Sequence, residues 1–133
     1  MAFYRTREGA LTAADSFRAL GSLFGQSTTS SIQIPKQASQ IVGIIATVSS
    51  DSATNGATTF AMQLSGDGLS QGQETITVGS QGVDGTPASN GATNLPFSLD
   101  VAIPVVGSNQ VSVAMAMDTD VGTCSCAVTL VFA

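Results

Sequence analysis

The chain has 133 residues, the usual size of one domain, and only 10% of them are charged whereas 43% are hydrophobic. It contains no His, no Trp and one Tyr, which removes the commonest general base and metal ligand and most stacking platforms for sugars and bases. The net charge of −5 is uneven, since all four basic residues fall in the first 36 positions and residues 37–133 carry seven acids, so the body is expected to repel nucleic acid and anionic membranes.

Residues 1–30 are expected to form an N-terminal arm with an amphipathic helix over about residues 12–24. Thr12 is a suitable N-cap, Asp15 follows three residues later in a near capping-box arrangement, and Gly25 is placed to end the helix. The apolar residues that recur on one helical face are Ala13, Phe17, Leu20 and Phe24. Because a helix of about 12 residues is marginal alone, this face is expected to pack on its own sandwich, on a neighbouring subunit or on a membrane surface. The polar face lacks the Lys/Arg cluster of membrane-surface helices.

Residues 31–133 are expected to form an all-β domain, an antiparallel two-sheet sandwich, because apolar and polar residues alternate there with a period of two. The seven expected strands are 32–34, 42–48, 59–64, 75–78, 95–103, 111–117 and 124–132. Turn-forming residues separate them at 51–56, 66–72, 79–91 and 107–109. Stretch 79–91 is long for a loop in a compact domain, and such loops are often functional or mobile.

The outward positions of these strands carry Thr, Ser, Ala and Gln, and no Lys or Arg follows Lys36. A freely diffusing monomer usually protects its sheet edges and surfaces with charged residues, Lys especially. The composition therefore favours a protein that covers much of its surface with neighbours in an oligomer or lattice. The alternative is a weakly charged soluble domain that its acidic residues keep dispersed.

Two cysteines, Cys124 and Cys126, lie two residues apart on the last expected strand. Their side chains point to the same face roughly 6.5–7 Å apart along the strand, at or beyond the reach of an unstrained disulfide. They continue an apolar stripe, so we interpret them as buried free thiols that act as small hydrophobes. An intermolecular disulfide is the minor alternative.

Asp118 and Asp120, followed by Gly122, superficially suggest a calcium loop, but the remaining ligands of that motif are missing. The simpler interpretation is a tight hairpin between the last two strands; the alternative is a calcium ion at a subunit junction, completed by a neighbour's carboxylate. The chain contains no His that could activate a serine nucleophile. We therefore expect no enzymatic activity, no cofactor and no metal site.

With no secretory leader expected, the combination of an expected helical arm and a Ser/Thr/Gly-rich sandwich that ends on its last strand at 124–132 resembles the single jelly-roll or β-sandwich minor capsid and cement proteins of phages and viruses. The resemblance implies an eight-stranded jelly roll, so one strand beyond the seven is expected in 79–91 or in the arm. It implies a virion protein made in the host cytoplasm. Its partners would be copies of itself, in trimers or similar oligomers, and a major capsid protein. No direct nucleic-acid contact, membrane insertion or small-molecule substrate is expected.

The arm's charge and apolar face predict the residues that contact neighbouring subunits, namely Arg5, Arg7, Phe17, Leu20 and Phe24. Two other functions stay open. One is a subunit of an extracellular filament or pilus, which needs open head-to-tail contacts rather than closed clusters. The other is a glycan- or peptide-binding module that uses the 79–91 loop, against which the scarcity of aromatic residues counts.

Overall fold

The computed structural model describes residues 2–11, 17–21, 31–51, 56–83, 92–117 and 124–133. These residues form nine β-strands and, within these ranges, no helix. The strands are β1 (Phe3–Leu11), β2 (Arg18–Ala19), β3 (Ser31–Gln33), β4 (Gln40–Asp51), β5 (Gly56–Ser65), β6 (Glu74–Val83), β7 (Ala92–Pro104), β8 (Gln110–Met117) and β9 (Cys124–Phe132).

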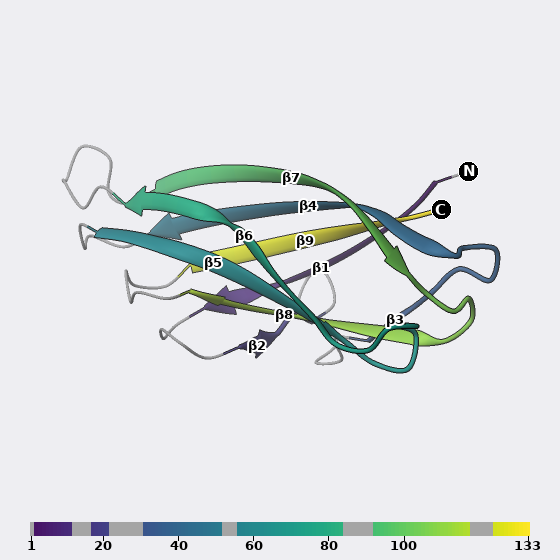
Figure 1. The fold of residues 1–133 in the computed structure, drawn as a ribbon. Helices are drawn as coiled ribbons and strands as arrows, with labels where there is room; N and C mark the ends of the chain where they lie inside the picture. Colours follow the sequence, from purple (N-terminus) through teal and green to yellow (C-terminus); the bar gives the residue numbers. More distant parts are fainter. Residues whose placement is uncertain (1, 12–16, 22–30, 52–55, 84–91, 118–123) are drawn as a thin grey trace.

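The strands lie in two antiparallel sheets that face each other, as predicted (Figure 1). Sheet A has the order β1-β9-β4-β7, and sheet B has the order β2-β8-β5-β6, with β3 also paired to β8. Most connections between the described strands pass from one sheet to the other, because only β2–β3 and β5–β6 join consecutive strands of the same sheet. The chain therefore builds both sheets together, and neither is a separate unit along the sequence.

The period-two alternation correctly predicts the core. In β9, Cys124, Cys126, Val128 and Leu130 are buried, while Ser125 is exposed. Residues directly opposite each other in an antiparallel pair share a face, so the buried positions of β9 align with Ile44, Ala46 and Val48 of β4. Similar rows from β5 and β8, which include Phe60, Met62, Val113 and Met115, fill the core from the other sheet.

The helical arm is not supported. Residues 3–11 form strand β1 at the edge of sheet A, which supplies the additional strand that we expected in 79–91 or in the arm. Arg18 and Ala19 pair with Met115 and Ala114 of β8, while Thr12, Ala13, Asp15 and Phe24 lie outside the described residues. An isolated helix of about 12 residues is only marginally stable in water. Pairing with existing strands instead satisfies the hydrogen-bonding groups of the backbone and buries the Leu20 side chain.

Backbone hydrogen bonds join this N-terminal segment to both sheets. Leu20 donates its N–H to the carbonyl oxygen of Val113 in sheet B over 2.9 Å, and Glu8 of sheet A exchanges N–H···O bonds of 3.1 and 2.9 Å with Gly21. The segment 17–21 therefore spans the rim between β1 and β8. The division of the chain at residue 30 stays a prediction, although both β1 and β2 pair with strands that lie beyond it.

Two predicted connections differ from the structure. The stretch 79–91 is not entirely a loop, since β6 continues to Val83 and pairs there with β5; residues 84–91 lie outside the described residues. The predicted hairpin between the last two strands is wrong, because β8 pairs with β5 in sheet B and β9 pairs with β1 and β4 in sheet A. Asp118 and Asp120 lie outside the described residues.

The turns at 66–72 and 107–109 are confirmed as connections between strands. Gly66 and Gly72 have φ of 121° and 84°, the left-handed region in which a residue without a Cβ is at ease. At the second turn it is Ser108, with φ of 72°, that adopts the left-handed conformation. Its N–H donates to the Ile34 carbonyl oxygen over 3.0 Å, which fastens this turn to the segment that follows β3.

Candidate functional site

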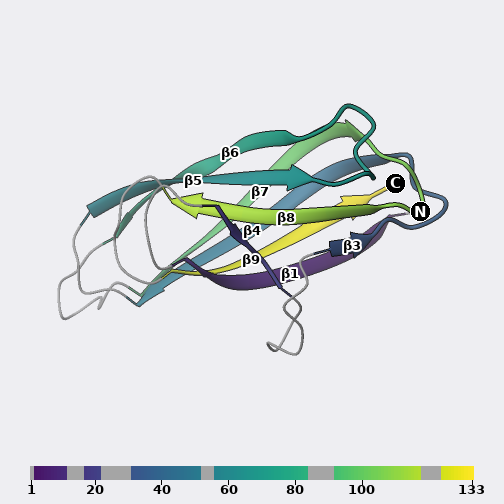
Figure 2. The ribbon, with the colours of Figure 1, turned by 90° about the horizontal axis from the view of Figure 1, so that it is seen from below.

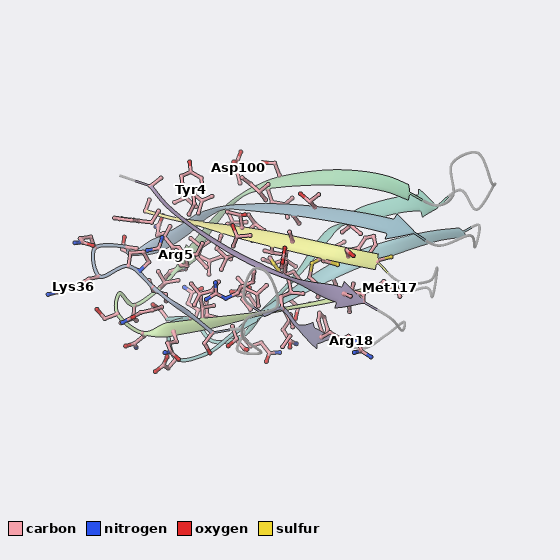
Figure 3. The ribbon with its side chains drawn as sticks, turned by 180° about the vertical axis from the view of Figure 1, so that it is seen from behind. Tyr4, Arg5, Arg18, Lys36, Asp100 and Met117 are labelled. Atoms are coloured by element: carbon pink, nitrogen blue, oxygen red, sulfur yellow. The ribbon has the colours of Figure 1, made fainter. Side chains whose placement is uncertain are left out.

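Three of the four basic residues meet at one pocket of about 400 Å³ on the rim between β1 and β3. Arg5 and Arg7 come from β1 of sheet A, and Lys36 comes from the segment after β3 of sheet B. The remaining lining residues are Ile32, Gln33, Ile34, Pro35 and Ser108. Figure 2 shows β1 and β3 along the same rim, and in Figure 3 Arg5 and Lys36 lie toward one end of the molecule, away from Arg18.

The strand register explains why β1 presents arginines there. Arg5 lies opposite Leu130 and Arg7 lies opposite Val128, so both occupy positions on the core-facing side of sheet A. Because β1 is an edge strand, these positions look across the rim toward the other sheet instead of into the packed interior. The long aliphatic stems can then lie along apolar neighbours while the guanidinium groups reach solvent.

Arg7 links the two sheets across this rim. Its Nη2 donates to the Ser31 carbonyl oxygen over 2.8 Å, and its Nη1 donates to the Thr6 carbonyl oxygen over 2.9 Å. Its Nε is shielded from solvent and has no hydrogen-bond partner among the described residues. Arg5 is exposed, and its Nη1 donates to the carbonyl oxygen of the adjacent Tyr4 over 3.0 Å. Both guanidinium groups therefore keep donors for a further acceptor.

The outer face of sheet A is nearly free of charge. At its described outward positions the charged residues are Glu8 on β1 and Asp100 on β7, at the two edges of the sheet. Between them lie neutral side chains, including Ile45, which is 39% exposed, and the Thr6–Thr129 hydroxyl pair, whose oxygens are 2.8 Å apart. Tyr4 is 60% exposed on β1. In Figure 3, Tyr4 and Asp100 lie on the same side of the molecule.

The outer face of sheet B is also uncharged over the side chains that the structure describes. The residues that alternate with the buried ones are Ser112, Ala114 and Ala116 on β8, Thr59, Ala61, Gln63 and Ser65 on β5, and Thr75 and Thr77 on β6. Monomeric soluble domains usually carry charged residues at about a quarter to a third of their surface positions. Both sheets thus present broad neutral faces.

The prediction of buried free thiols is confirmed. Cys124 and Cys126 are both free and buried, and the Cys126 thiol lies 3.8 Å from the Cys124 carbonyl oxygen. Burial, and then the negative charge of a neighbouring Cys124 thiolate, raises the pKa of Cys126 to about 12. A thiol that stays protonated at neutral pH is a poor nucleophile and a poor metal ligand, so this pair contributes packing.

Of the five arm residues predicted to contact neighbours, the four that the structure describes are not brought together. Arg5 and Arg7 share the rim pocket, whereas Phe17 is 41% exposed next to β2. Leu20 is fully buried in the core of its own chain, and Phe24 lies outside the described residues. Sequence reasoning missed Lys36 as a companion of the arginines. The clustering of all basic residues before position 37 was the only signal for it.

No group of three or more potential metal ligands occurs among the described residues. In the same part of the chain, no helix is long and apolar enough to cross a membrane.

No protein-family model and no curated protein matches this sequence. Among solved structures, the chain is similar to part of latent PorU from Porphyromonas gingivalis, with 9% identity and a TM-score of 0.55 over 98% of this chain but only 12% of PorU. It is similar to a carbohydrate-binding module of the glycoside hydrolase family 9 enzyme Cel9A from Ruminococcus flavefaciens FD-1, with 10% identity and a TM-score of 0.50 over 99% and 98% of the two chains.

A protein of infectious bursal disease virus, Gx strain, is 13% identical with a TM-score of 0.47 over 99% of this chain and 31% of its own. This last likeness supports no inference. At these identities the first two share the β-sandwich fold with this chain, and the shared fold is all that they establish.

Proposed function

We propose that this chain is a non-enzymatic structural protein of a virion, a minor shell or cement subunit that associates with copies of itself and with a larger shell through its sheet faces. The observation that carries the proposal is the scarcity of charge on the outer faces of both sheets, where the only charged residues among the described side chains are Glu8 and Asp100, both at edges of sheet A. Desolvating a charged side chain on association is costly, whereas neutral Thr, Ser, Ala and Ile side chains lose little when a neighbour covers them.

The strand order supports the same proposal. Sheets of order β1-β9-β4-β7 and β2-β8-β5-β6, joined mostly by connections that cross between them, follow the two-Greek-key plan of a jelly roll. That fold occurs in viral capsid and lectin domains. The lectin alternative needs aromatic platforms for sugar rings. Of the described exposed aromatic residues, Tyr4 lies on β1 of sheet A and Phe17 precedes β2 of sheet B, so the described residues form no such platform.

The test is the solution mass of the full chain by light scattering over a wide concentration range, beside Ile45→Lys and a matched control, Val106→Lys. Both residues are exposed aliphatics, at 39% and 43%, but Ile45 lies on the outer face of sheet A and Val106 in the connection after β7. We expect a discrete oligomer whose dissociation constant rises about tenfold or more in Ile45→Lys, equivalent to about 1.4 kcal/mol, and little change in Val106→Lys.

A monomer at every concentration, with no association in the presence of the larger shell, would refute the proposal. Equal effects of the two variants would refute the role of the sheet A face. Electron microscopy of the assembled protein separates the virion proposal from the filament alternative, because closed shells and open fibres differ in symmetry.

A further inference from the structure

We propose that the rim pocket of Arg5, Arg7 and Lys36 binds a carboxylate group of a second copy of this chain. The inference rests on the proposed function and names the polar contact that fixes how two copies join. The neutral sheet faces can supply buried contact area, but they do little to fix the orientation of two copies. An arginine–carboxylate contact has a defined geometry and sets the register of an interface.

The first step is the concentration of positive charge. Three of the chain's four basic residues line this one pocket, its described lining includes no acidic residue, and the net charge of the whole chain is −5. Like charges gathered in this way repel each other and raise the local positive potential. Within the described part of the chain, no carboxylate is paired with Arg5, Arg7 or Lys36. The charge is therefore available to an external anion.

The second step is the state of Arg7. Its two bonds to the Thr6 and Ser31 carbonyl oxygens hold the guanidinium group in place across the rim, and its buried Nε–H has no acceptor among the residues that the structure describes. Buried donors are nearly always satisfied in folded proteins. An oxyanion that enters the pocket beside a guanidinium already held by its backbone bonds meets oriented donors and needs little further ordering of that side chain.

The third step identifies the occupant. Residues 37–133 carry seven acids and no base, so the body of one copy complements the pocket of another. Among the acids with described side chains, Asp67 accepts the Gln110 N–H over 3.1 Å and Glu74 is half-buried. Asp100 is exposed and has no partner within the described residues. We therefore assign Asp100 as the carboxylate that enters the pocket.

The placement of these groups gives the contact a direction. The arginines lie on β1 and Asp100 lies on β7, the two opposite edge strands of sheet A. A contact from one edge to the other is head-to-tail, so it closes into a ring when the rotation between copies permits and otherwise continues as a fibre. Rings of this type are the clusters from which a shell or a decoration is built.

The experiment measures self-association by sedimentation velocity at low and high sodium chloride for the wild type and four variants. Arg5→Glu changes an exposed residue of the pocket, and Arg18→Glu is the matched control with the same charge change at an exposed residue away from the pocket (Figure 3). Asp100→Arg changes the assigned partner, and Arg5→Glu/Asp100→Arg restores opposite signs across the contact. Thermal melts verify that each variant is folded.

We expect Arg5→Glu and Asp100→Arg each to weaken association about tenfold or more, and the double variant to recover most of that loss. Arg18→Glu should stay within about threefold of the wild type, and association of the wild type should weaken at high salt, as interface ion pairs do. If Arg5→Glu and Arg18→Glu have the same effect while the protein still assembles, the pocket proposal is wrong and the proposed function stands. If no variant and no wild type assembles, both fail.

A second measurement tests whether the pocket instead takes a free anion. Inorganic phosphate is titrated at constant ionic strength, while the Arg7 Nε–H resonance and the molecular mass are followed. Under the proposal, phosphate competes with the Asp100 carboxylate, so the resonance shifts as the oligomer dissociates. A saturable shift of the Arg7 Nε–H resonance with no change in molecular mass would mean that the pocket binds a soluble phosphate. That result would overturn the assignment of a second copy as the occupant. A resonance that never shifts would overturn the site as an oxyanion pocket.

Discussion

Leu20 decides between two accounts of the N-terminal region, and its replacement by Ala separates them. In the structure Leu20 is fully buried among core residues of its own chain. Leu→Ala replacements at such positions cost about 3 kcal/mol, because the lost burial adds to the residual cavity. In the helical-arm account Leu20 would face a neighbouring subunit. Leu20→Ala would then weaken association and leave the free energy of unfolding of the monomer within about 0.5 kcal/mol of the wild type.

A substitution at Gly9 provides a second, independent test of the packing of Leu20 against β1. A Cβ added at Gly9 would lie 3.0 Å from Leu20 Cδ2 and 3.7 Å from Leu20 Cα. Gly9→Ala alone therefore pushes the leucine side chain aside, at a cost of about 1 kcal/mol. When Leu20 is also Ala, the crowding atom is gone and the new methyl group fills part of the cavity. The double variant should be more stable than the sum of the single effects by about 1 kcal/mol.

The assay is urea unfolding monitored by circular dichroism, with linear extrapolation of the free energy of unfolding to zero urea. It is repeated at several protein concentrations, because association contributes to apparent stability. Phe17→Ser is the control, since Phe17 is 41% exposed and belongs to the same segment; its cost should stay below about 1 kcal/mol. A Leu20→Ala protein as stable as Phe17→Ser, or additive effects of Gly9→Ala and Leu20→Ala, would refute the placement of residues 17–21 against β1.

Two further predictions concern the core and the pocket. Burial and the Cys124 charge raise the pKa of Cys126 to about 12 from its ordinary 9.0, so the folded-state pKa lies above the unfolded one. The protonated Cys126 thiol therefore makes its full contribution to the free energy of unfolding below pH 9. Above pH 9 the free energy of unfolding should fall by about 1.4 kcal/mol per pH unit until pH 12, as urea titrations will measure; an equal slope in Cys126→Ala would contradict this. Gly107→Ala would place a Cβ in a steric clash with the backbone carbonyl oxygen of Lys36 and should destabilise the protein by about 2 kcal/mol. In Gly43→Ala the nearest atom is 3.5 Å away, so similar melting temperatures of the two variants would count against that steric reasoning.

The sequence by itself determined the seven strands of residues 31–133 and the side chains that they bury. A strand with one buried face leaves a period-two pattern in its own residues, and that pattern does not depend on which strand lies beside it. For the same reason Cys124 and Cys126 were correctly assigned to the core from their place in the stripe of Val128 and Leu130. The neutral outward positions could be predicted from the same pattern, because they are the residues that alternate with the buried ones.

Strand β1 left no such pattern, because its core-facing positions include Arg5, Arg7 and Gly9. Only an edge strand tolerates arginines there, and whether a strand is at an edge depends on its neighbours in the folded sheet. Residues 17–21 were misread since the helical spacing of Phe17 and Leu20 is a local signal, whereas the hydrogen bond from Leu20 to Val113 that overrides it is non-local.

The rim pocket was decided entirely by the tertiary structure. Arg7 and Ser31 are 24 residues apart, and nothing in the residues between them indicates that their atoms meet. The crossing connections bring β1 of one sheet against β3 of the other, and this closure of two sheets places Lys36 beside the arginines. Local alternation fixes which face of a strand is buried, but only the pairing of distant strands fixes which charged groups share a rim, because register and sheet order are properties of the whole chain.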